Sequence, residues 1–304
     1  MKGFVLTGRI LSDCEKWILR EGKKYIKELD HIPITQVYVS NFSPYFDNKK
    51  LSSYDFVIPR LPRTYVWYGY TVLSLIRNEI FSPILPEALI FSHNKFLTLL
   101  ILSEYGLPVP ETFLSLKRKN LEEILDRMGF PVVFKLLYGS LGKGVMFADS
   151  KPSALSIMDT LERFSQPIFL EEFVPHRGYD IRTFVLGDRV LAAEKRVARK
   201  GERRTNIGIG GRGVFIRKLD PEIEELSIKA AKALGMQICG MDIIEGPDGP
   251  VIIEANVNVH FEGLAKVSGI NVAREIVKFV RDEAKEQKMT KFERLMKWLR
   301  ISLS

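Results

Sequence analysis

The sequence contains few of the residues that cross-link or bind soft metals. Its 304 residues include two cysteines, Cys14 and Cys239, and four histidines, and there is no C-x-x-C pair. A chain stabilised by disulfides normally has many more cysteines, and a thiolate zinc site normally needs closely spaced ones. A disulfide framework and a thiolate zinc site are therefore not expected.

Long apolar runs are also missing. The longest, residues 96–102, is interrupted by Thr98, whereas a membrane-spanning helix needs about 20 apolar residues. The first apolar run, residues 3–8, is too short for the core of a signal peptide. We therefore expect a cytoplasmic protein without a transmembrane segment.

Acidic residues are fewer than basic ones. There are 37 Asp and Glu against 45 Lys and Arg, which gives a net charge of +8 and a pI near 9.3. This balance suits a polyanionic partner, either a nucleotide or a nucleic acid. The basic residues are scattered and lack the aromatic stacking motifs of nucleic-acid-binding proteins. A basic nucleic-acid-binding module without catalysis is therefore the less favoured alternative.

What is present is an alternation of strand and helix patterns, typical of an α/β protein. In the first third, a helix over 13–29 lies among strands over 3–8, 34–40 and 54–60, which predicts a small parallel sheet. Later helices are predicted over 94–105, 121–128, 151–164, 220–234 and 272–285. Later strands are predicted over 111–116, 131–137, 167–174, 180–187, 189–197, 237–244 and 250–256.

A glycine-rich loop follows one of these strands, at Gly139–Gly144. It fails as a Walker A motif because Val145 and Met146 follow the last glycine. A second pattern, G-x-G-x-x-G at 208–213, precedes a strand and so lacks the context of a dinucleotide-binding turn. Glycines let backbone N–H groups approach an anion. The loop predicts a phosphate site with Lys135 beside it, or alternatively a plain hairpin turn.

Acidic residues gather in a later hairpin. Side chains alternate along a strand, so Glu254 and Asn256 share a face. A five-residue loop over 246–250 would set Asp242 opposite Glu254. The residues then expected on the core face are Ile243, Val251 and Ile253. Two acids and an amide on one face predict a Mg²⁺ site, and the alternative is a solvated polar face.

Taken in order, these motifs resemble the ATP-grasp ligases, and specifically the RimK-type amino-acid (α-L-glutamate) ligases. Residues 169–211 carry D-I-R, V-x-G-D and R-[ST]-N-x-x-x-G-G, and residues 241–264 resemble the metal-binding hairpin of that family. The resemblance implies an ATP-grasp fold with an N-terminal parallel-sheet domain and two α+β lobes that clasp ATP. The implied segments are an N-terminal domain over 1–92, a central lobe over 93–171, a C-terminal lobe over 172–288 and a basic amphipathic tail over 289–304.

The resemblance also implies roles for individual residues. Arg196 and Lys135 are the implied catalytic residues. Asp242, Glu254 and Asn256 are the implied ligands of one or two Mg²⁺ ions, with Mn²⁺ as a substitute. The implied ATP-binding residues are Lys95, Lys135, Gly139, Ser140, Gly142, Lys143, Gly144, Glu171, Glu172, Phe173, Val174, Asp180, Arg204, Thr205 and Asn206.

The reaction implied by the resemblance joins a carboxylate to an amine through an acyl phosphate, with ATP converted to ADP. The expected substrates are an amino acid, with glutamate favoured, and a carboxylate-bearing acceptor on a cofactor, small molecule or protein terminus. An alternative is a lysine- or arginine-biosynthesis-type ligase acting on an acidic carrier protein. The chain departs from the family at residues 256–260, which read NVNVH, and at Ile209, which replaces an arginine. Both changes lie on the acceptor side. Arg212 either substitutes for the missing arginine or does not, and His260 is a candidate for acceptor contact, with a satisfied or solvated histidine as the favoured alternative.

The C-terminal tail has an amphipathic helical pattern. Apolar residues at 292, 295, 296 and 299 alternate with basic ones. This pattern predicts a helix that docks on its own domain or on a second subunit of a homo-oligomer, with a membrane surface as the less favoured partner.

Overall fold

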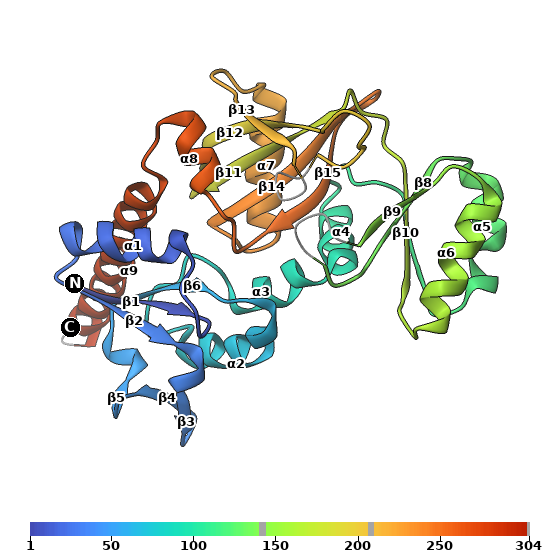
Figure 1. Cartoon of the computed structure of the whole chain (residues 1–304). Helices are drawn as coiled ribbons and strands as arrows, with labels where there is room; N and C mark the ends of the chain where they lie inside the picture. The colour runs from blue at the N-terminus through green and yellow to red at the C-terminus, as the bar shows by residue number, and fades with distance from the viewer. Residues whose placement is uncertain (140–143, 206–209, 303–304) are drawn as a thin grey trace.

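The computed structural model describes residues 1–139, 144–205 and 210–302, with side chains described up to residue 290 (Figure 1). The N-terminal part contains the expected parallel sheet, in the order β2 (Glu28–Pro33), β1 (Lys2–Thr7), β6 (Phe56–Arg60). Helix α1 (Asp13–Tyr25) precedes β2. A small antiparallel sheet follows, formed by β3 (Tyr38–Ser40), β4 (Ser43–Phe46) and β5 (Lys49–Lys50).

The second strand of the parallel sheet was predicted in the wrong place. The chain leaves α1 at Ile26, whose backbone is extended, and the strand is β2 rather than residues 34–40. Residues Ile34–Gln36 form a 3-10 turn instead. Because β2 pairs with β1 alone, it is an edge strand and tolerates the polar residues Glu28 and Asp30. These polar residues interrupt the apolar pattern from which strands were predicted.

Three helices connect this part to the central sheet: α2 (Val66–Ile76), α3 (Pro86–His93) and α4 (Lys95–Glu104). Helix α4 was predicted, and the Asn94 side chain caps it by accepting a hydrogen bond from the Leu97 N–H at 3.2 Å. Helices α2 and α3 were not predicted. Helix α2 contains Gly69 and several aromatic residues, which favour helices weakly, so burial of its apolar face stabilises it.

The central sheet has the order β7 (Thr112–Ser115), β10 (Ile168–Glu172), β8 (Val132–Lys135), β9 (Val145–Ala148). The predicted helices α5 (Glu122–Met128) and α6 (Lys151–Arg163) pack on it. Together they enclose a separate apolar core that includes Phe134, Met158 and Leu170. Strand β9, which was not predicted, pairs antiparallel with β8.

The third sheet is antiparallel, in the order β13 (Arg212–Phe215), β12 (Arg189–Val197), β11 (Tyr179–Leu186), β14 (Ile238–Gly246), β15 (Gly249–Asn256). Helix α7 (Pro221–Ala233) packs against it and has the predicted ends. The Asp220 side chain caps the helix, Pro221 begins it, and Gly235 follows it with a positive φ of 68°. One apolar core joins this sheet to the N-terminal sheet, through residues such as Phe4, Leu6 and Met241.

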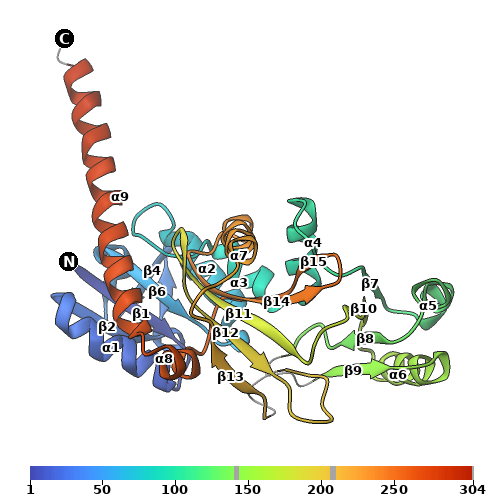
Figure 2. The ribbon, with the colours of Figure 1, turned by 90° about the horizontal axis from the view of Figure 1, so that it is seen from above.

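The chain ends with α8 (Glu262–Ser268), which was not predicted, and α9 (Val272–Ser302). Helix α9 was expected to end near Lys285 but continues to Ser302. It packs on α1, and its last turns extend away from the rest of the molecule (Figure 2). The side chains of the predicted apolar face at 292–299 lie outside the described residues. The division of the chain at residues 92, 171 and 288 stays a prediction.

Among the described residues, no helix is both long and apolar enough to span a bilayer.

Candidate active site

A pocket opens where the central sheet meets the five-stranded sheet. Including its open mouth, it encloses about 810 Å³ of empty space. Most of the predicted site residues meet here. Those that line the pocket are Lys95, Lys135, Gly139, Glu171, Glu172, Phe173, Val174, Asp180, Arg196, Arg204, Thr205, Asp242 and Glu254.

Two described candidates, Gly144 and Asn256, are not among the lining residues. The Gly144 carbonyl accepts a hydrogen bond from the Leu136 N–H at 2.8 Å and so extends the β8–β9 hairpin. Asn256 ends β15, and its buried Nδ2 has no hydrogen-bond partner among the described residues. The candidates Ser140, Gly142, Lys143 and Asn206 lie outside the described residues.

Two lysines reach the pocket from different elements. Lys95 begins α4, and its Nζ lies 2.7 Å from Glu254 Oε2. Lys135 ends β8, and its Nζ lies 2.5 Å from Glu171 Oε2 on β10. Burial raises the pKa of Glu171 even though Lys135 opposes the shift, and its Oε1 has no partner in the described part of the chain. Both ammonium groups are therefore already paired with carboxylates at the edge of the cavity.

A row of four charged residues crosses the five-stranded sheet. Glu194, Arg182, Asp242 and Glu254 occupy matching positions on β12, β11, β14 and β15. The Arg182 guanidinium donates to both oxygens of Asp242, each at 2.6 Å. Burial alone would raise the pKa of Asp242, but Arg182 and Arg196 outweigh it and hold that pKa well below its usual range. Asp242 is thus a fully buried, ionised carboxylate.

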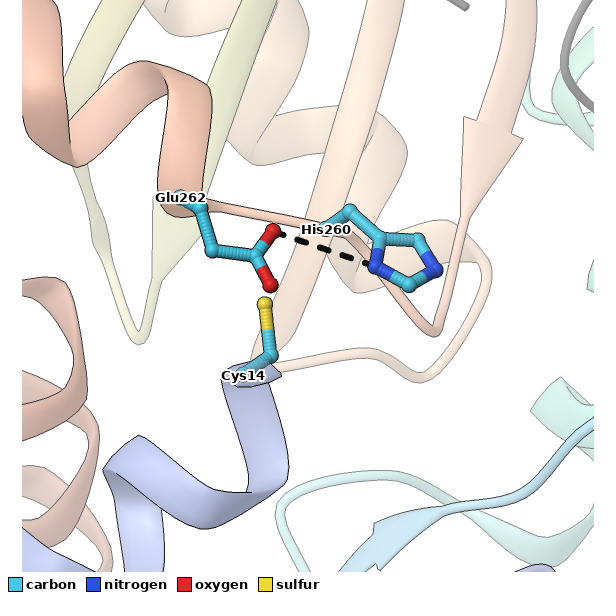
Figure 3. Close-up of side chains that lie close together, drawn as sticks. All are labelled: Cys14, His260 and Glu262. Atoms are coloured by element: carbon cyan, nitrogen blue, oxygen red, sulfur yellow. Dashed lines mark ion pairs between the residues drawn. The ribbon is translucent and has the colours of Figure 1, made fainter. Parts of the chain in front are cut away.

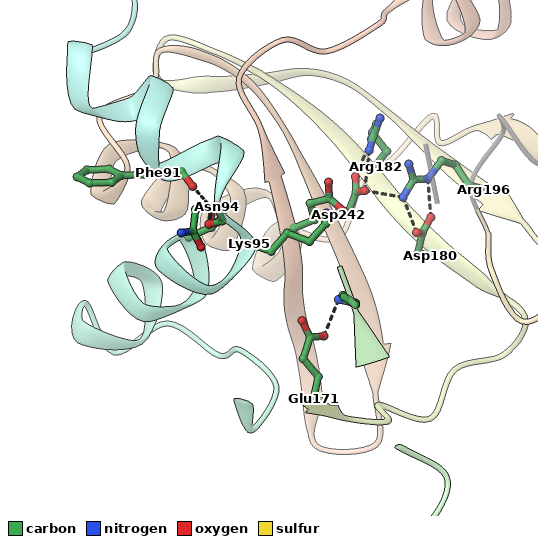
Figure 4. A network of polar contacts seen from close by, with 11 residues as sticks. Phe91, Asn94, Lys95, Glu171, Asp180, Arg182, Arg196 and Asp242 are labelled. Atoms are coloured by element: carbon green, nitrogen blue, oxygen red, sulfur yellow. Dashed lines mark hydrogen bonds and ion pairs between the residues drawn. The ribbon is translucent and has the colours of Figure 1, made fainter. Parts of the chain in front are cut away.

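Arg196 bridges two carboxylates. Its Nε and Nη2 donate to Asp180 at 2.7 and 2.5 Å, and Nη2 also lies 2.8 Å from Asp242 Oδ2. Thr205 Oγ1 donates to the same Asp180 at 2.6 Å. Burial lowers the pKa of Arg196, but the two acids more than compensate and raise it, so the guanidinium stays charged. Figure 4 shows this chain of contacts from Arg182 through Asp242 and Arg196 to Asp180.

Two of these charged residues, Arg182 and Glu194, were missed from the sequence. Both lie two positions from a recognised residue, Arg182 after Asp180 and Glu194 before Arg196, so strand alternation places them on the same face. That spacing was the signal available. Glu194 is buried, one of its oxygens has no partner among the described residues, and burial raises its pKa despite the two arginines.

The β14–β15 hairpin has the predicted pairing but a different turn. Asp242 lies opposite Glu254, as expected, yet the strands continue to Gly246 and Gly249 around a two-residue turn. A β-bulge at Ile253 restores the register. Ile243 faces the core as predicted, whereas the expected core position of Ile253 is wrong. Ile252 is fully buried in the core, and Ile253 lines the pocket.

Apolar side chains cover the rest of the pocket. Ile244 and Ile253 contribute from the five-stranded sheet, and Phe147 and Phe173 meet edge to face with ring centroids 6.1 Å apart. The Arg203 guanidinium lies 5.5 Å from the Phe147 ring. His176, Tyr179 and Arg203 also line the pocket and were not predicted. The cavity therefore has an apolar region beside a strongly charged one.

Asp242, Glu254 and Asn256 offer oxygen donors on neighbouring strands. Oxygen donors are the ligands that Mg²⁺ prefers, and Mg²⁺ is usually held by one or two carboxylates. The donor set therefore fits a hard divalent cation. In this structure Asp242 is neutralised by arginines and Glu254 by Lys95.

Residues 92–280 match the RimK-like ATP-grasp domain. The chain belongs to the RimK-like ATP-grasp family. A protein of Legionella pneumophila (strain Corby) named "Probable alpha-L-glutamate ligase" is 36% identical over 238 residues, which is 77% of this chain and 78% of that protein. This RimK-like chain is therefore an ATP-grasp ligase, an enzyme class that uses ATP and a divalent metal.

Solved structures have the same fold. The ATP-grasp ligase PsnB, in complex with a minimal precursor, Mg and ADP, is similar with a TM-score of 0.73 and 18% identity, over 93% of this chain and 97% of that one. D-alanine–D-alanine ligase from Bacillus anthracis, in complex with ATP, gives a TM-score of 0.66 and 18% identity, over 94% and 99% of the two chains. These similarities confirm the predicted ATP-grasp fold.

Proposed function

We propose that this RimK-like ligase adds an amino acid, with glutamate favoured, to a carboxylate-bearing acceptor through an acyl phosphate. One observation carries the proposal. Lys95 and Lys135 reach the same pocket as the Asp242–Glu254 pair, although these residues come from two different sheets and a helix. Cations for phosphate groups and oxygen ligands for a metal therefore face one cavity.

In this proposal the apolar region of the pocket holds the adenine. Ile244, Ile253 and Phe173 offer apolar contacts, and the end of β10 at Glu171 and Glu172 offers backbone polar groups. Val174 continues this edge, and Asp180, Arg204 and Thr205 also line the pocket. Asn206, beside Thr205 in sequence, is included from the family resemblance alone.

The triphosphate lies toward the lysines. Lys95 and Lys135 exchange their present partners, Glu254 and Glu171, for phosphate oxygens. Asp242, Glu254 and Asn256 would hold Mg²⁺, or Mn²⁺ as a substitute. When bound, the metal neutralises charge on the phosphate oxygens. The PsnB complex, which has the same fold and contains Mg and ADP, supports this choice of ligands.

The chemistry then needs two steps. The acceptor carboxylate attacks the γ-phosphoryl group, giving an acyl phosphate and ADP. The amine of the amino acid attacks the acyl carbon, phosphate leaves, and an amide forms. Arg196 is the residue proposed to stabilise the oxyanion of the second step, because its buried guanidinium stays charged in the pocket.

The identity of the amino acid is the finer part of the proposal. Glutamate is favoured because the Legionella relative is named a probable alpha-L-glutamate ligase. An acidic acceptor, such as a peptide ending in glutamate, suits the net charge of +8. The alternative is an acidic carrier protein of the lysine- or arginine-biosynthesis type. A cytoplasmic location and a homo-oligomeric state stay predictions.

The test is an acceptor screen with ATP, Mg²⁺ and glutamate, in which products are identified by mass spectrometry and ADP is measured. Lys135→Met and Glu254→Gln should each lower ADP formation at least about 100-fold. Lys151→Met is the matched control, because Lys151 pairs with Asp126 on the surface. The site assignment is wrong if the first two variants work at the wild-type rate. The glutamate assignment is wrong if other amino acids are added and glutamate is not.

A further inference from the structure

Three side chains with metal-binding groups meet away from the pocket. Cys14 lies in the first turn of α1, His260 precedes α8, and Glu262 is the first residue of α8 (Figure 3). Their sulfur, nitrogen and oxygen atoms all lie within 4.8 Å of one another. None of the three lines the pocket described above. The cluster therefore joins the beginning of the chain to its C-terminal part at a place separate from the ATP-binding region.

The cluster has one buried ligand and two accessible ones. Cys14 is fully buried, whereas the side chains of His260 and Glu262 are 59% and 41% exposed. The Phe261 N–H donates to Cys14 Sγ at 3.3 Å, which fixes the sulfur relative to the segment that carries the other two groups. His260 Nδ1 lies 3.9 Å from Glu262 Oε2. An ion can thus enter from solvent and meet a sulfur held in place.

The charges around the cluster also allow a cation. The nearby guanidinium of Arg60 is already paired with Glu15, with Nε 3.0 Å from Oε1, and it donates to the Val259 carbonyl at 2.9 Å. Glu262 leaves a carboxylate beside the sulfur, with His260 as its ion-pair partner. A divalent ion that displaced the thiol proton of Cys14 would offset the charge of the resulting thiolate and that of this carboxylate.

We propose that Cys14, His260 and Glu262 form a binding site for a zinc-class divalent cation, with water as the fourth ligand. One sulfur, one imidazole nitrogen and one carboxylate oxygen are the mixed ligands that Zn²⁺ accepts and that Mg²⁺ does not. Ligand atoms around tetrahedral zinc lie about 3.5 Å apart, given bond lengths of about 2.0–2.3 Å. The exposed side chains of His260 and Glu262 can close the remaining distance by rotation.

This site differs from the oxygen-ligand site at Asp242 and Glu254 in both place and chemistry. Its function would be structural, because the ion would fasten α1 to α8 across the boundary between the N-terminal sheet and the five-stranded sheet. The sequence predicted no thiolate zinc site. The three ligands are far apart in the chain and form no spaced cysteine motif, so only the fold brings them together.

Cobalt(II) is the probe for this proposal, because a cobalt–thiolate bond gives a charge-transfer absorption in the near ultraviolet. Metal-free full-length protein should develop this band with one equivalent of Co²⁺, and excess Mg²⁺ should not remove it. Cys14→Ser should abolish the band. Cys239→Ser is the matched control, because Cys239 is the other buried cysteine and is not part of the cluster, so its variant should keep the band.

The exposed ligands keep the test valid if Cys14→Ser does not fold. His260→Ala and Glu262→Gln should each weaken Co²⁺ binding at least about 10-fold and reduce the rise in melting temperature that Zn²⁺ gives the wild type. The proposal is overturned if no thiolate band appears, if the band persists in Cys14→Ser, or if His260→Ala binds Co²⁺ as tightly as the wild type. Each result is independent of whether the chain ligates glutamate.

Discussion

At the scale of single residues, buried ion pairs keep the charged side chains of the pocket ionised and in place. Asp180 and Asp242 are buried carboxylates, and Arg196 contacts both, while Arg182 holds Asp242 with two hydrogen bonds. Breaking such a pair by removing one partner is costly, because the other charge remains buried without compensation. Arg182 and Arg196 therefore stabilise the folded protein, because they compensate the buried charges of these two acids.

Replacing Arg182 should destabilise the protein strongly. Arg182→Gln removes the bidentate contact with Asp242, and we expect the free energy of unfolding to fall by about 3 kcal/mol. Urea denaturation at pH 7 measures this change. Arg189→Gln in the same hairpin is the control. Its side chain is 62% exposed, so the expected change is within about 0.5 kcal/mol. Equal stability of the two variants would contradict the prediction.

His93 should make stability depend on pH. Burial lowers its pKa to about 4, and the charges of Arg63 and Lys95 contribute to the shift. The unfolded chain takes up the proton near pH 6.5 and the folded one only near pH 4. The contribution of neutral His93 to the free energy of unfolding is therefore complete above pH 6.5 and is lost as pH falls toward 4.

The variant His93→Gln should lose less stability on acidification. Because glutamine does not titrate, its free energy of unfolding should fall by about 3 kcal/mol less than that of the wild type between pH 6.5 and 4. Chemical denaturation at several pH values gives both curves. Parallel curves for the two proteins would rule out this role for His93.

At the scale of elements, the β14–β15 hairpin shows how a local irregularity sets the site. The bulge at Ile253 turns two successive side chains, Ile253 and Glu254, toward the pocket, while Ile252 and Ala255 face the core. A regular strand would alternate and could present only one of the two. The bulge thus places an apolar contact directly beside a proposed metal ligand.

Two alanine substitutions distinguish this register from the one expected for a five-residue loop. Ile252→Ala should cost about 3 kcal/mol of unfolding free energy, because Ile252 is fully buried in the core. Ile253→Ala should cost less than about 1 kcal/mol but should weaken binding of an ATP analogue. Thermal unfolding and calorimetric titration measure the two effects. The opposite order of stabilities would favour the regular register.

The sequence predicted best the elements whose ends carry local signals. Helix α7 has Asp220, Pro221 and Gly235 at its ends, and the alternating strands around it were also predicted. The polar edge strand β2 and the aromatic-rich helix α2 depend on tertiary packing, so local patterns did not predict them. The family motifs and the alternation of side chains along a strand predicted the acidic residues of the pocket, Asp242 and Glu254. Alternation from Asp180 could also have placed Arg182 on the pocket face, but its pairing with Asp242 and the bulge required the register of the whole sheet.

At the scale of the whole molecule, the N-terminal segment is built into the rest of the fold. It shares an apolar core with the five-stranded sheet, and Gln237 N–H and Leu85 N–H bond to Pro83 and Gly235 carbonyls at 2.7 and 2.8 Å. Arg60 adds a buried hydrogen bond to the Val259 carbonyl. The central sheet, in contrast, has a core of its own.

Residues 1–92 should therefore not fold alone. Without the five-stranded sheet, this fragment would expose apolar side chains that are buried in the shared core, such as Phe4, Leu6 and Ile84. We expect circular dichroism of the isolated fragment to show no cooperative thermal transition, whereas the full chain shows one. A cooperative transition in the fragment would mean that the shared core is dispensable for its folding.

The segment that forms the central sheet begins and ends at nearly the same place in the structure. The Glu172 N–H bonds to the Glu111 carbonyl at 2.9 Å, so the two ends of this long excursion lie one hydrogen bond apart. A segment whose two ends lie close together behaves as an inserted domain. Such a segment can be exchanged between proteins without changing the path of the rest of the chain. Recombination between genes of related ligases could thus replace this segment as one unit. The exchange would change the side of the pocket that carries Lys135 and leave the side that carries Asp242 unchanged.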